Sequence, residues 1–492
     1  MRGTVFGPRV GMAALSSLHK VIPEPTPAPR MGRWSAALSL LLVASVGGLI
    51  VAMRALTVAR SRELSAEARL ALAEDPELAL LLAMEAARTS PTRQAEEALR
   101  GALLDAPLLP VLRGHKAELR DVKFAPDGQT VATASNDATA RLWDAASGKM
   151  LVKLKGHKDQ VLAVAYSPDS RLLVTASEDK TARVWQVPSG REVAILGGHR
   201  LTVNGGVFSP DGRYVLTVSN DDTARVRDTS TWRTVATLEG HTSGVDGGVF
   251  SPDGRLVVTV SRDTTTRVWE ASTGKAVGVF EGHVPWITAA TFSPDGKLIV
   301  NGGACPSPTR CDPTVRVWDV ASGGRVAELH GHTAGVNSAA FSPNGKYVVS
   351  ASDDETVRLW ELGTGQNIGQ IRDYQSGAQH AIFSPDGGMV ATASHDRVAH
   401  IWIPPTSPLR STNEDGLFVL RGHADPLSSI AFSPDGRLVV TASWDGTARV
   451  WEVTGRRERL ARLRSVGELL ALAEKRAGRS LTDEEKKRFL SD

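Results

Sequence analysis

Residues 156–185 read GHKDQVLAVAYSPDSRLLVTASEDKTARVW. Two apolar runs, 161–166 and 172–177, are separated by S-P-D-S, and a tight turn at 178–180 leads into T-A-R-V-W. The sequence V-P-S-G-R then turns the chain into a fourth apolar run, 193–196. Short runs bounded by Gly, Pro, Asp and Ser are typical of strands joined by hairpin turns. The stretch therefore predicts a unit of four antiparallel strands.

This unit recurs along most of the chain. Its end, T-A-R-V-W or a variant of it, occurs at 139–143, 181–185, 223–227, 265–269, 314–318, 356–360, 398–402 and 447–451. Successive ends are 42, 42, 42, 49, 42, 42 and 49 residues apart. A period of about 40–45 residues is typical of a propeller of four-stranded blades and not of a helical solenoid. We predict an all-β fold in which residues 107–452 form one propeller of eight blades.

The two ends of the repeat region indicate how the ring closes. An apolar strand at 108–112 precedes the first Gly-His pair, and no blade comes before it. The last unit stops at Trp451 without a fourth strand of its own. We predict that the N-terminal strand completes the last blade, which removes the open sheet edges that promote aggregation.

With these motifs the chain resembles the WD-repeat family of β-propellers. The resemblance implies a buried hydrogen-bond set in each blade, made by the His of the Gly-His loop, a Ser of the second strand, the Asp of the next turn and the Trp of the third strand. Five blades carry all four residues: His115, Ser135, Asp137 and Trp143; His157, Ser177, Asp179 and Trp185; His241, Ser261, Asp263 and Trp269; His332, Ser352, Asp354 and Trp360; His423, Ser443, Asp445 and Trp451.

Three blades depart from this pattern. Blade 3 has Arg227 in place of the Trp, blade 5 has Gly303 in place of the Ser, and blade 7 has Tyr374 in place of the His. A buried polar network is costly when it is only partly satisfied. We therefore expect these three blades to be locally less stable than the others.

The repetition argues against an enzyme, although Ser, His and Asp also form catalytic triads. A nucleophile is needed once, whereas these residues recur in nearly every blade. No G-x-x-x-x-G-K-[ST] sequence and no Cys/His cluster with zinc spacing is present in the sequence. We predict no catalytic residue, no cofactor and no metal. Lys plus Arg (57) nearly balance Asp plus Glu (54), which gives no general attraction to nucleic acid.

A membrane segment is predicted before the repeats. Residues 34–53 contain no charge, and twenty helical residues span about 30 Å, the thickness of the hydrocarbon core. The alternative is a cleaved signal peptide, whose apolar core is normally shorter. Five Lys/Arg precede the segment and four lie within twenty residues after it, a bias toward a cytoplasmic N-terminus and an exported propeller. A start at Met31 would weaken this bias.

The segments that flank the membrane segment and the repeats differ in composition. Residues 1–33 are Pro-rich and expected to be disordered, 55–105 form a helical linker, and 456–490 form C-terminal helices. Small residues at Ala44, Gly48 and Ala52 could let two membrane helices pair as a homodimer. The helical flanks resemble those of bacterial membrane-anchored WD-repeat proteins, many of which carry a signalling nucleoside-triphosphatase that is lacking in this sequence.

Two cysteines occur in an insertion of blade 5. The stretch A-C-P-S-P-T-R-C contains Cys305 and Cys311, which bracket two prolines and could close a disulfide loop that would suit an exported propeller. Two free thiols in a cytoplasmic protein are the alternative. The insertion at 404–415 is polar and Pro-rich and predicts a surface loop.

Partner contacts are expected beside the repeated pattern. In WD-repeat proteins the face with the Gly-His loops and Asp turns usually binds partners, and Trp and Arg are frequent anchors there. The candidates are Arg120, Arg262, Trp286 and Trp444. Three functions remain open: a membrane-anchored scaffold or sensor that binds an unknown protein, the regulatory propeller of a split signalling nucleoside-triphosphatase system, and a propeller enzyme.

Overall fold

The computed structural model describes residues 34–72, 75–105, 108–282, 287–303, 305, 311–372, 374–406, 416–454, 465–477 and 479–490. Internal contacts divide the chain into two units, residues 1–57 and 58–492. The helices are α1 (Trp34–Ala71), α2 (Pro76–Thr89), α3 (Arg93–Asp105), α5 (Val466–Arg476) and α6 (Asp483–Leu490).

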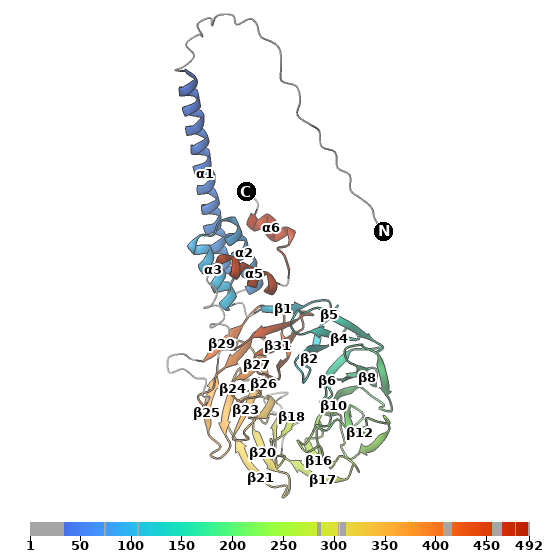
Figure 1. Cartoon of the computed structure of the whole chain (residues 1–492). Helices are drawn as coiled ribbons and strands as arrows, with labels where there is room; N and C mark the ends of the chain where they lie inside the picture. The colour runs from blue at the N-terminus through green and yellow to red at the C-terminus, as the bar shows by residue number, and fades with distance from the viewer. Residues whose placement is uncertain are drawn as a thin grey trace, which may run out of the picture. The chain divides into compact units, whose positions relative to one another are not determined.

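Eight four-stranded antiparallel sheets form the propeller, and each is one blade (Figure 1). Blade 1 contains β2 (Leu119–Phe124), β3 (Thr130–Ser135), β4 (Thr139–Asp144) and β5 (Met150–Lys155). Blade 2 contains β6 (Val161–Tyr166), β7 (Leu172–Ser177), β8 (Ala182–Gln186) and β9 (Glu192–Leu196). Blade 3 contains β10 (Val203–Phe208), β11 (Tyr214–Ser219), β12 (Ala224–Asp228) and β13 (Thr234–Leu238). Blade 4 contains β14 (Val245–Phe250), β15 (Leu256–Ser261), β16 (Thr265–Glu270) and β17 (Ala276–Glu281).

The second half of the ring repeats this order. Blade 5 contains β18 (Ile287–Phe292), β19 (Leu298–Gly303), β20 (Val315–Asp319) and β21 (Arg325–Leu329). Blade 6 contains β22 (Val336–Phe341), β23 (Tyr347–Ser352), β24 (Val357–Glu361) and β25 (Asn367–Ile371). Blade 7 contains β26 (Ala378–Phe383), β27 (Val390–Ser394), β28 (Ala399–Trp402) and β29 (Leu417–Leu420). Blade 8 contains β30 (Leu427–Phe432), β31 (Leu438–Ser443), β32 (Ala448–Glu452) and, from the N-terminal side, β1 (Leu108–Leu112).

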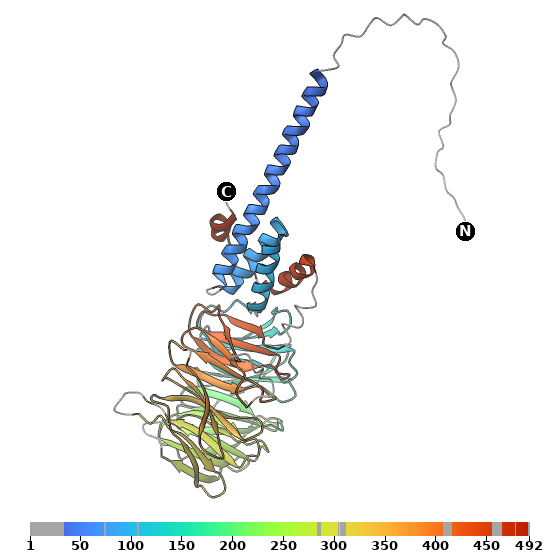
Figure 2. The ribbon, with the colours of Figure 1, turned by 90° about the vertical axis from the view of Figure 1, so that its left-hand side faces the viewer.

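The predicted closure of the ring is confirmed. Strand β1 pairs antiparallel with β32, with Leu108 opposite Trp451 and Leu112 opposite Ala448. The first strand of blade 1, β2, packs against the first strand of blade 8, β30, and also against β6 of blade 2. The blades therefore follow one another around the ring in chain order, and blade 1 is the neighbour of blade 8. Figure 2 shows the same ring from the side.

The core between the blades explains why the repeat needs its apolar positions. The second strand of each blade is buried along most of its length, because both faces of the sheet are covered by neighbouring blades. Val, Leu and Ala of one blade meet the first-strand Phe and the Trp of the next, as where Val174 and Val184 pack with Phe208. A strand buried on both faces needs a nearly continuous apolar run. The polar groups that remain inside must then find partners within the blade.

The helices before and after the propeller share one apolar core. Leu64 of α1, Leu80 of α2 and Leu99 of α3 pack with Leu469 and Ala473 of α5. Asp75 caps α2, whose first residue is a proline, and accepts the backbone N–H groups of residues 77 and 78 at 3.1 and 3.0 Å. The sequence pattern treats the linker and the tail as separate segments, but the structure joins them. We refer to this core and its helices as the helical module.

The helical module contacts blade 8 through charged groups. The carboxylate of Glu77, which is buried, accepts a hydrogen bond from Arg113 beside β1. Arg479, between α5 and α6, lies 3.6 Å from the same carboxylate and 2.8 Å from that of Glu485. The residue that follows β1 and the C-terminal tail thus both contact the carboxylate of Glu77. Within the described part of the chain, the structure contains no helix with the length and apolarity needed to cross a membrane.

Candidate functional site: the Gly-His face of the propeller

The loops and turns of each blade divide between the two faces of the ring. The Gly-His loop leads into the first strand of a blade, and the Asp turn joins its second and third strands. Because neighbouring strands are antiparallel, the Gly-His loop and the Asp turn lie on the same face. In blade 2 the backbone N–H of Lys158, next to the Gly-His pair, donates to the Asp179 carboxylate at 3.0 Å. We call this the Gly-His face. The S-P-D turns and the turns between the third and fourth strands lie on the opposite face.

Blade 2 shows the buried network in its complete form. The Nδ1 of His157 lies 2.9 Å from the Asp179 carboxylate, and its Nε2 lies 2.7 Å from the hydroxyl of Thr175. The indole N–H of Trp185 donates to the same hydroxyl at 2.9 Å. One proton order satisfies every group: the indole donates to Thr175, Thr175 donates to Nε2, and Nδ1–H donates to the carboxylate.

The serine predicted for this network has a different place in the structure. Ser177 accepts the backbone N–H of Asp179 at 3.1 Å and donates to the carbonyl of Asp159 at 3.1 Å. It therefore ties the Asp turn to the Gly-His loop and does not bridge His157 and Trp185. The bridging hydroxyl belongs to Thr175, two residues earlier, whose side chain points to the same side of the strand.

The same arrangement recurs around the ring. The bridging hydroxyls of the other complete blades are those of Thr133, Thr259, Ser350 and Thr441. The serines two residues later, at positions 135, 261, 352 and 443, donate to a backbone carbonyl of the Gly-His loop. Repetition of Thr at this position was the sequence signal for the bridge, and the prediction based on the later Ser missed it.

Burial sets the charge states in the network. Burial lowers the pKa of His157 below its ordinary value of 6.5, and the hydrogen bond to Asp179 opposes this only partly. Burial also raises the pKa of Asp179, but hydrogen bonds from Thr181, the Lys158 backbone and His157 outweigh it, so that the pKa falls to about 2. The imidazole is neutral and the carboxylate charged at neutral pH. The pair serves to hold the loop and the turn together.

Arg227 of blade 3 replaces the Trp without opening a gap in the network. Its guanidinium is buried and donates to the hydroxyl of Thr217 at 3.0 Å, as an indole does in the other blades. A second N–H of the group donates to the carbonyl of Gly197. Burial lowers the pKa of Arg227 to about 10, which keeps it charged at neutral pH.

Blades 5 and 7 also contain substitutes. In blade 7 the hydroxyl of Tyr374 lies 2.6 Å from that of Thr392, and the backbone N–H groups of Gln375 and Val398 donate to the Asp396 carboxylate. In blade 5 the amide oxygen of Asn301 accepts the indole N–H of Trp318 at 3.2 Å. Gly303 stands where the other blades have the later Ser, so it does not interrupt the bridge. His283 lies outside the described residues.

On part of the Gly-His face, side chains next to the repeated motif residues form hydrogen bonds with one another. In blade 3 the amide of Asn204 donates to Asn220 at 2.7 Å and to the carbonyl of Val245 in the next blade at 2.9 Å. Asn337 of blade 6 repeats this arrangement with Asp353 at 2.6 Å and the carbonyl of Ala378 at 3.0 Å. These side chains are structural links between neighbouring blades.

Arg262, a predicted partner-binding residue, belongs to the same class. In blade 4 its guanidinium contacts both oxygens of the Asp246 carboxylate, at 3.1 and 3.0 Å from Nε. The hydrogen bonds and charge of Asp246 raise the pKa of Arg262 above its ordinary value. A partner would have to break this contact before it could use either group.

Trp444 of blade 8 and Arg120 of blade 1 occupy positions equivalent to these and are not linked in this way, whereas Gln379 of blade 7 donates to Asp353 of blade 6 at 3.5 Å. The indole of Trp444 in blade 8 is 37% exposed and contacts the ring of His395 in blade 7, with 5.5 Å between centroids. The hydroxyl of Ser428 makes no hydrogen bond to any described residue. Arg120 is half-buried, and among the described residues it forms no ion pair. We call this region the 7–8–1 sector.

The predicted partner-binding residues therefore do not form one patch. Arg120 and Trp444 lie in neighbouring blades 1 and 8, whereas Arg262 lies in blade 4, three blades from blade 1 and four from blade 8. Trp286 lies outside the described residues. Only the first two remain together as a candidate surface.

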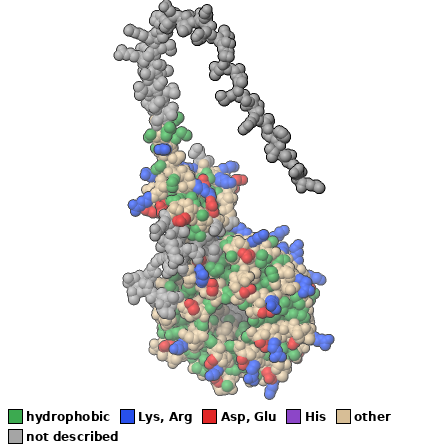
Figure 3. Space-filling model, viewed as in Figure 1, with side chains coloured by type: hydrophobic (Ala, Val, Ile, Leu, Met, Phe, Trp, Pro, Cys, Tyr) green, Lys and Arg blue, Asp and Glu red, His purple; other side chains and the backbone are tan. Residues whose placement is uncertain are grey.

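Cys305 and Cys311 form a disulfide, and neither cysteine of the sequence is free. Figure 3 shows a hollow at the centre of the ring. Among the described residues there is no group of three or more His, Cys, Asp and Glu side chains suited to hold a metal ion.

The fold and the repeated network define the protein class as an eight-bladed β-propeller, in which most blades contain a buried chain of Trp, a Thr or Ser hydroxyl, His and Asp. The family model described as WD domain, G-beta repeat matches residues 107–144, 148–186, 190–228, 232–270, 274–319, 323–361, 367–402 and 415–452. The chain belongs to the WD-repeat family.

A solved structure shares the propeller. The crystal structure of the computationally designed Ika8 protein matches with a TM-score of 0.61 and 28% sequence identity, covering 70% of this chain and 99% of the designed one. The similarity of the designed protein concerns the fold. WD-repeat propellers typically act as interaction scaffolds, which is the general function that the family supports for this chain.

Proposed function

We propose that this protein is a membrane-anchored scaffold or sensor that binds a partner protein through the 7–8–1 sector of its propeller. The observation that carries this proposal is the contrast on the Gly-His face. Side chains beside the repeat are paired with each other in blades 3, 4 and 6, whereas Trp444 of blade 8 and Arg120 of blade 1 keep exposed area, and Arg120 forms no ion pair among the described residues. Aromatic and Arg side chains with exposed area are the usual anchors of protein interfaces.

The test is a crosslinked pull-down from membranes with the full chain. Trp444→Ala combined with Arg120→Ala should lose the partner that the wild type captures, because both anchors are removed. Arg262→Ala is the matched control, since it removes an Arg of the same face that is already paired with Asp246. Retention of the partner by the double variant, or loss only in the control, would contradict the proposed sector.

The proposed anchor is the apolar segment 34–53. Helix α1 runs without interruption from Trp34 to Ala71, and in its described part Leu49, Ile50, Val51 and Met53 are all exposed by 48–68%. These consecutive residues lie around the helix and not on one face, and a helix that is apolar all round is suited to lipid. The side chains of residues 34–47 lie outside the described residues. Extraction of membranes with alkaline carbonate tests the proposal, since an integral protein stays in the pellet.

We further propose that the propeller lies on the exported side. The Cys305–Cys311 disulfide supports this, because disulfides persist in oxidising compartments. Thiol labelling of unreduced cells with a denaturing quench should modify neither cysteine, and prior reduction should allow both to react. Full labelling without reductant would overturn the exported placement.

The partner could be a separate signalling nucleoside-triphosphatase, for which this chain would be the regulatory part. The helical module supports a regulatory role, since it packs linker and tail together and contacts blade 8, the blade that carries Trp444. Measurement of nucleotide hydrolysis in the material captured by the wild type tests this choice. If that material does not hydrolyse nucleotides, the proposal of a nucleoside-triphosphatase partner is wrong, and the proposal of a scaffold is unaffected.

A further inference from the structure

The surroundings of Trp444 allow the class of partner to be narrowed, and this step rests on the proposed function of the 7–8–1 sector. Trp444 has a blade on each side. On the blade 7 side, His395 contacts the indole, and Arg397 two residues later reaches the carbonyl of Ala424 in blade 8 at 3.4 Å. A cation, Arg397, therefore bridges blades 7 and 8 two residues after the His that contacts the indole.

On the other side, the turn that carries Trp444 lies against the Gly-His loop of blade 1. A Cβ added to Gly446 would lie 3.3 Å from the carbonyl oxygen of Ala117 and 3.7 Å from that of His115. Lys116 lies between these two residues in the sequence and is exposed. Its backbone N–H is held by the Asp137 carboxylate at 3.1 Å, which places the start of this side chain at the boundary with blade 8.

The cations of the sector are available, and most nearby carboxylates are not. Among the described residues, Lys116, Arg120 and Arg397 form no ion pair. Glu118 is engaged by the amide of Asn136 at 2.9 Å, and the turn carboxylates bind their histidine or backbone N–H groups. Asp425 is the exposed carboxylate of the sector. Glu118 and the turn carboxylates keep their charges when they accept hydrogen bonds, but the side chains of Asp137 and Asp445 are only 6% and 9% exposed. At the surface of the sector the three cations therefore face the exposed Asp425 and the half-buried Glu118.

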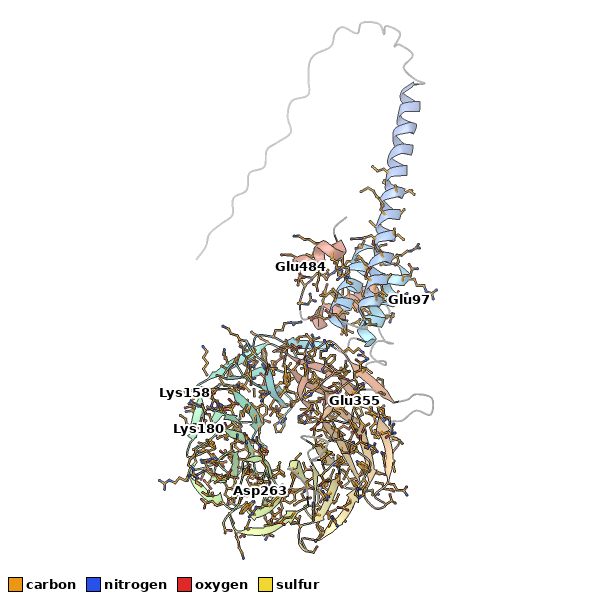
Figure 4. All side chains as sticks on the ribbon, turned by 180° about the vertical axis from the view of Figure 1, so that it is seen from behind. Glu97, Lys158, Lys180, Asp263, Glu355 and Glu484 are labelled. Atoms are coloured by element: carbon orange, nitrogen blue, oxygen red, sulfur yellow. A yellow bond between two sulfur atoms is a disulfide. The ribbon has the colours of Figure 1, made fainter. Side chains whose placement is uncertain are left out.

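The exposed charges elsewhere on the Gly-His face differ from one blade to another. Blade 2 has the exposed Lys158 and Lys180 beside the exposed Asp159 and the half-buried Glu178, whereas blade 6 presents the exposed Asp353 and Glu355. Figure 4 shows Lys158 and Lys180 together on one side of the ring and Glu355 on the other. An acidic chain would be attracted toward Lys116 and Arg120 of blade 1 and repelled from blade 6.

We propose that the 7–8–1 sector binds an extended acidic segment of the partner protein, with an apolar side chain of that segment on Trp444 and its carboxylates toward Lys116, Arg120 and Arg397. The apolar contact provides affinity through burial of the indole, and the charges provide orientation and a faster association rate. Clusters of basic side chains commonly recognise acidic motifs in this way.

Fluorescence anisotropy of fluorescein-labelled peptides with the full chain in a neutral detergent tests the proposal. The probes are EDEFDEDE, the same peptide with Ser for Phe, its basic counterpart KKKFKKKK, and a single-stranded dT20. EDEFDEDE should bind at least tenfold more tightly than the Ser peptide, and the basic peptide should not bind. Binding should weaken as salt is raised, because the contacts are between exposed charges.

Variants locate the site. Trp444→Ala should abolish the preference for Phe over Ser, and Lys116→Glu should weaken EDEFDEDE about tenfold. Lys149→Glu is the matched control, with the same charge change in the same blade but on the opposite face, and it should bind as the wild type does. Equal binding of the acidic and basic peptides, tighter binding of dT20 than of the peptide, or equal loss in the Lys149 control would each overturn the proposal.

The outcome of the peptide-binding experiment can be distinguished from that of the pull-down that tests the proposed function. If the pull-down remains sensitive to Trp444 while the acidic peptide shows no preference, the sector binds a partner of different chemistry and only the acidic segment is wrong. If the pull-down is insensitive to Trp444, the scaffold function at this sector fails first.

Discussion

Blades 2 and 3 perform the same internal task with different residues. In blade 2 the indole of Trp185 donates to Thr175, and in blade 3 the guanidinium of Arg227 donates to the equivalent Thr217. Both donors are buried, and both hydroxyls also contact the His of the Gly-His loop. The comparison shows that the network requires a buried N–H donor at this place and not an aromatic ring. A departure from the repeat is therefore not by itself a weakness.

The largest effect should come from removal of the bridge itself. Thr175→Val leaves the indole N–H of Trp185 and the Nε2 of His157 buried without a partner, at about 1–3 kcal/mol for each group. Hydrogen exchange of the β6–β9 peptides should show a local loss of about 3 kcal/mol. Thr237→Val is the control, because it makes the same change in β13, where the hydroxyl has no hydrogen bond among the described residues. Equal losses at both positions would contradict the bridging role.

Removal of the substitute donor in blade 3 should have a smaller effect. Arg227→Met keeps the length and burial but leaves the Thr217 hydroxyl and the Gly197 carbonyl without the guanidinium, a cost of about 2 kcal/mol. Arg227→Trp should recover part of this loss, since it restores the N–H to Thr217. Hydrogen exchange of β10–β13 measures both variants. If the Met variant is as stable as the wild type, the guanidinium is not a structural donor.

The seam between the last and first blades provides a third comparison. Asp121 in β2 accepts the hydroxyl of Ser429 in blade 8 at 2.8 Å and the backbone N–H of Val164 in blade 2 at 3.2 Å. Asp121→Ala should lower the thermal unfolding temperature, with a cost of about 1–2 kcal/mol from the lost hydrogen bonds. Ser338→Ala in blade 6 removes the single equivalent bond, to Ala381, and should cost less. The reverse order would show that Asp121 does not hold the seam.

The smallest effect should be the pH dependence of a single blade. Folding lowers the pKa of His157, so below about pH 6.5 the unfolded chain binds a proton that the native chain does not. The free energy of unfolding therefore decreases as the pH is lowered. The slope cannot exceed about 1.4 kcal/mol per pH unit for one histidine. Asp179, whose pKa is about 2, contributes stability above pH 3.8 that is lost as pH falls through 2, outside this window.

His157→Tyr copies the natural substitution of blade 7 and tests this sign. Hydrogen exchange of the β6–β9 peptides between pH 7 and 5.5, corrected for intrinsic rates, should show less acid destabilisation than in the wild type. Tyr374, which contacts Thr392 at 2.6 Å, shows that a phenol can fill the position. An unchanged pH slope would mean that the imidazole is not the group that titrates.

The ring could be predicted from the sequence because each repeat consists of residues that favour strands and turns through local interactions. Eight blades, their order and the closing strand 108–112 all followed from the period and its two ends. The bridging Thr175 was missed because Thr and Ser alternate on the second strand and both are buried. Only the side-chain positions show which hydroxyl meets the His.

The partner surface was predictable only in part, for a similar reason. Arg262 and Arg120 are equivalent in type, but Arg262 is neutralised by Asp246, sixteen residues earlier in the sequence. The core shared by α1, α2, α3 and α5 was not predicted, because it joins residues nearly 400 positions apart, such as Leu80 and Leu469. Contacts of this kind depend on ring closure, which brings the two ends of the propeller together.

The central claim is that partners bind the 7–8–1 sector and not the whole Gly-His face. Site-specific photocrosslinking tests it most directly, with benzoylphenylalanine placed at position 444 in one full-length chain and at the equivalent position 262 in another. In membranes irradiated under the same conditions, position 444 should give a crosslinked adduct of one defined mass and position 262 should give none. An adduct from position 262 alone, or the same adduct from both positions, would contradict the claim.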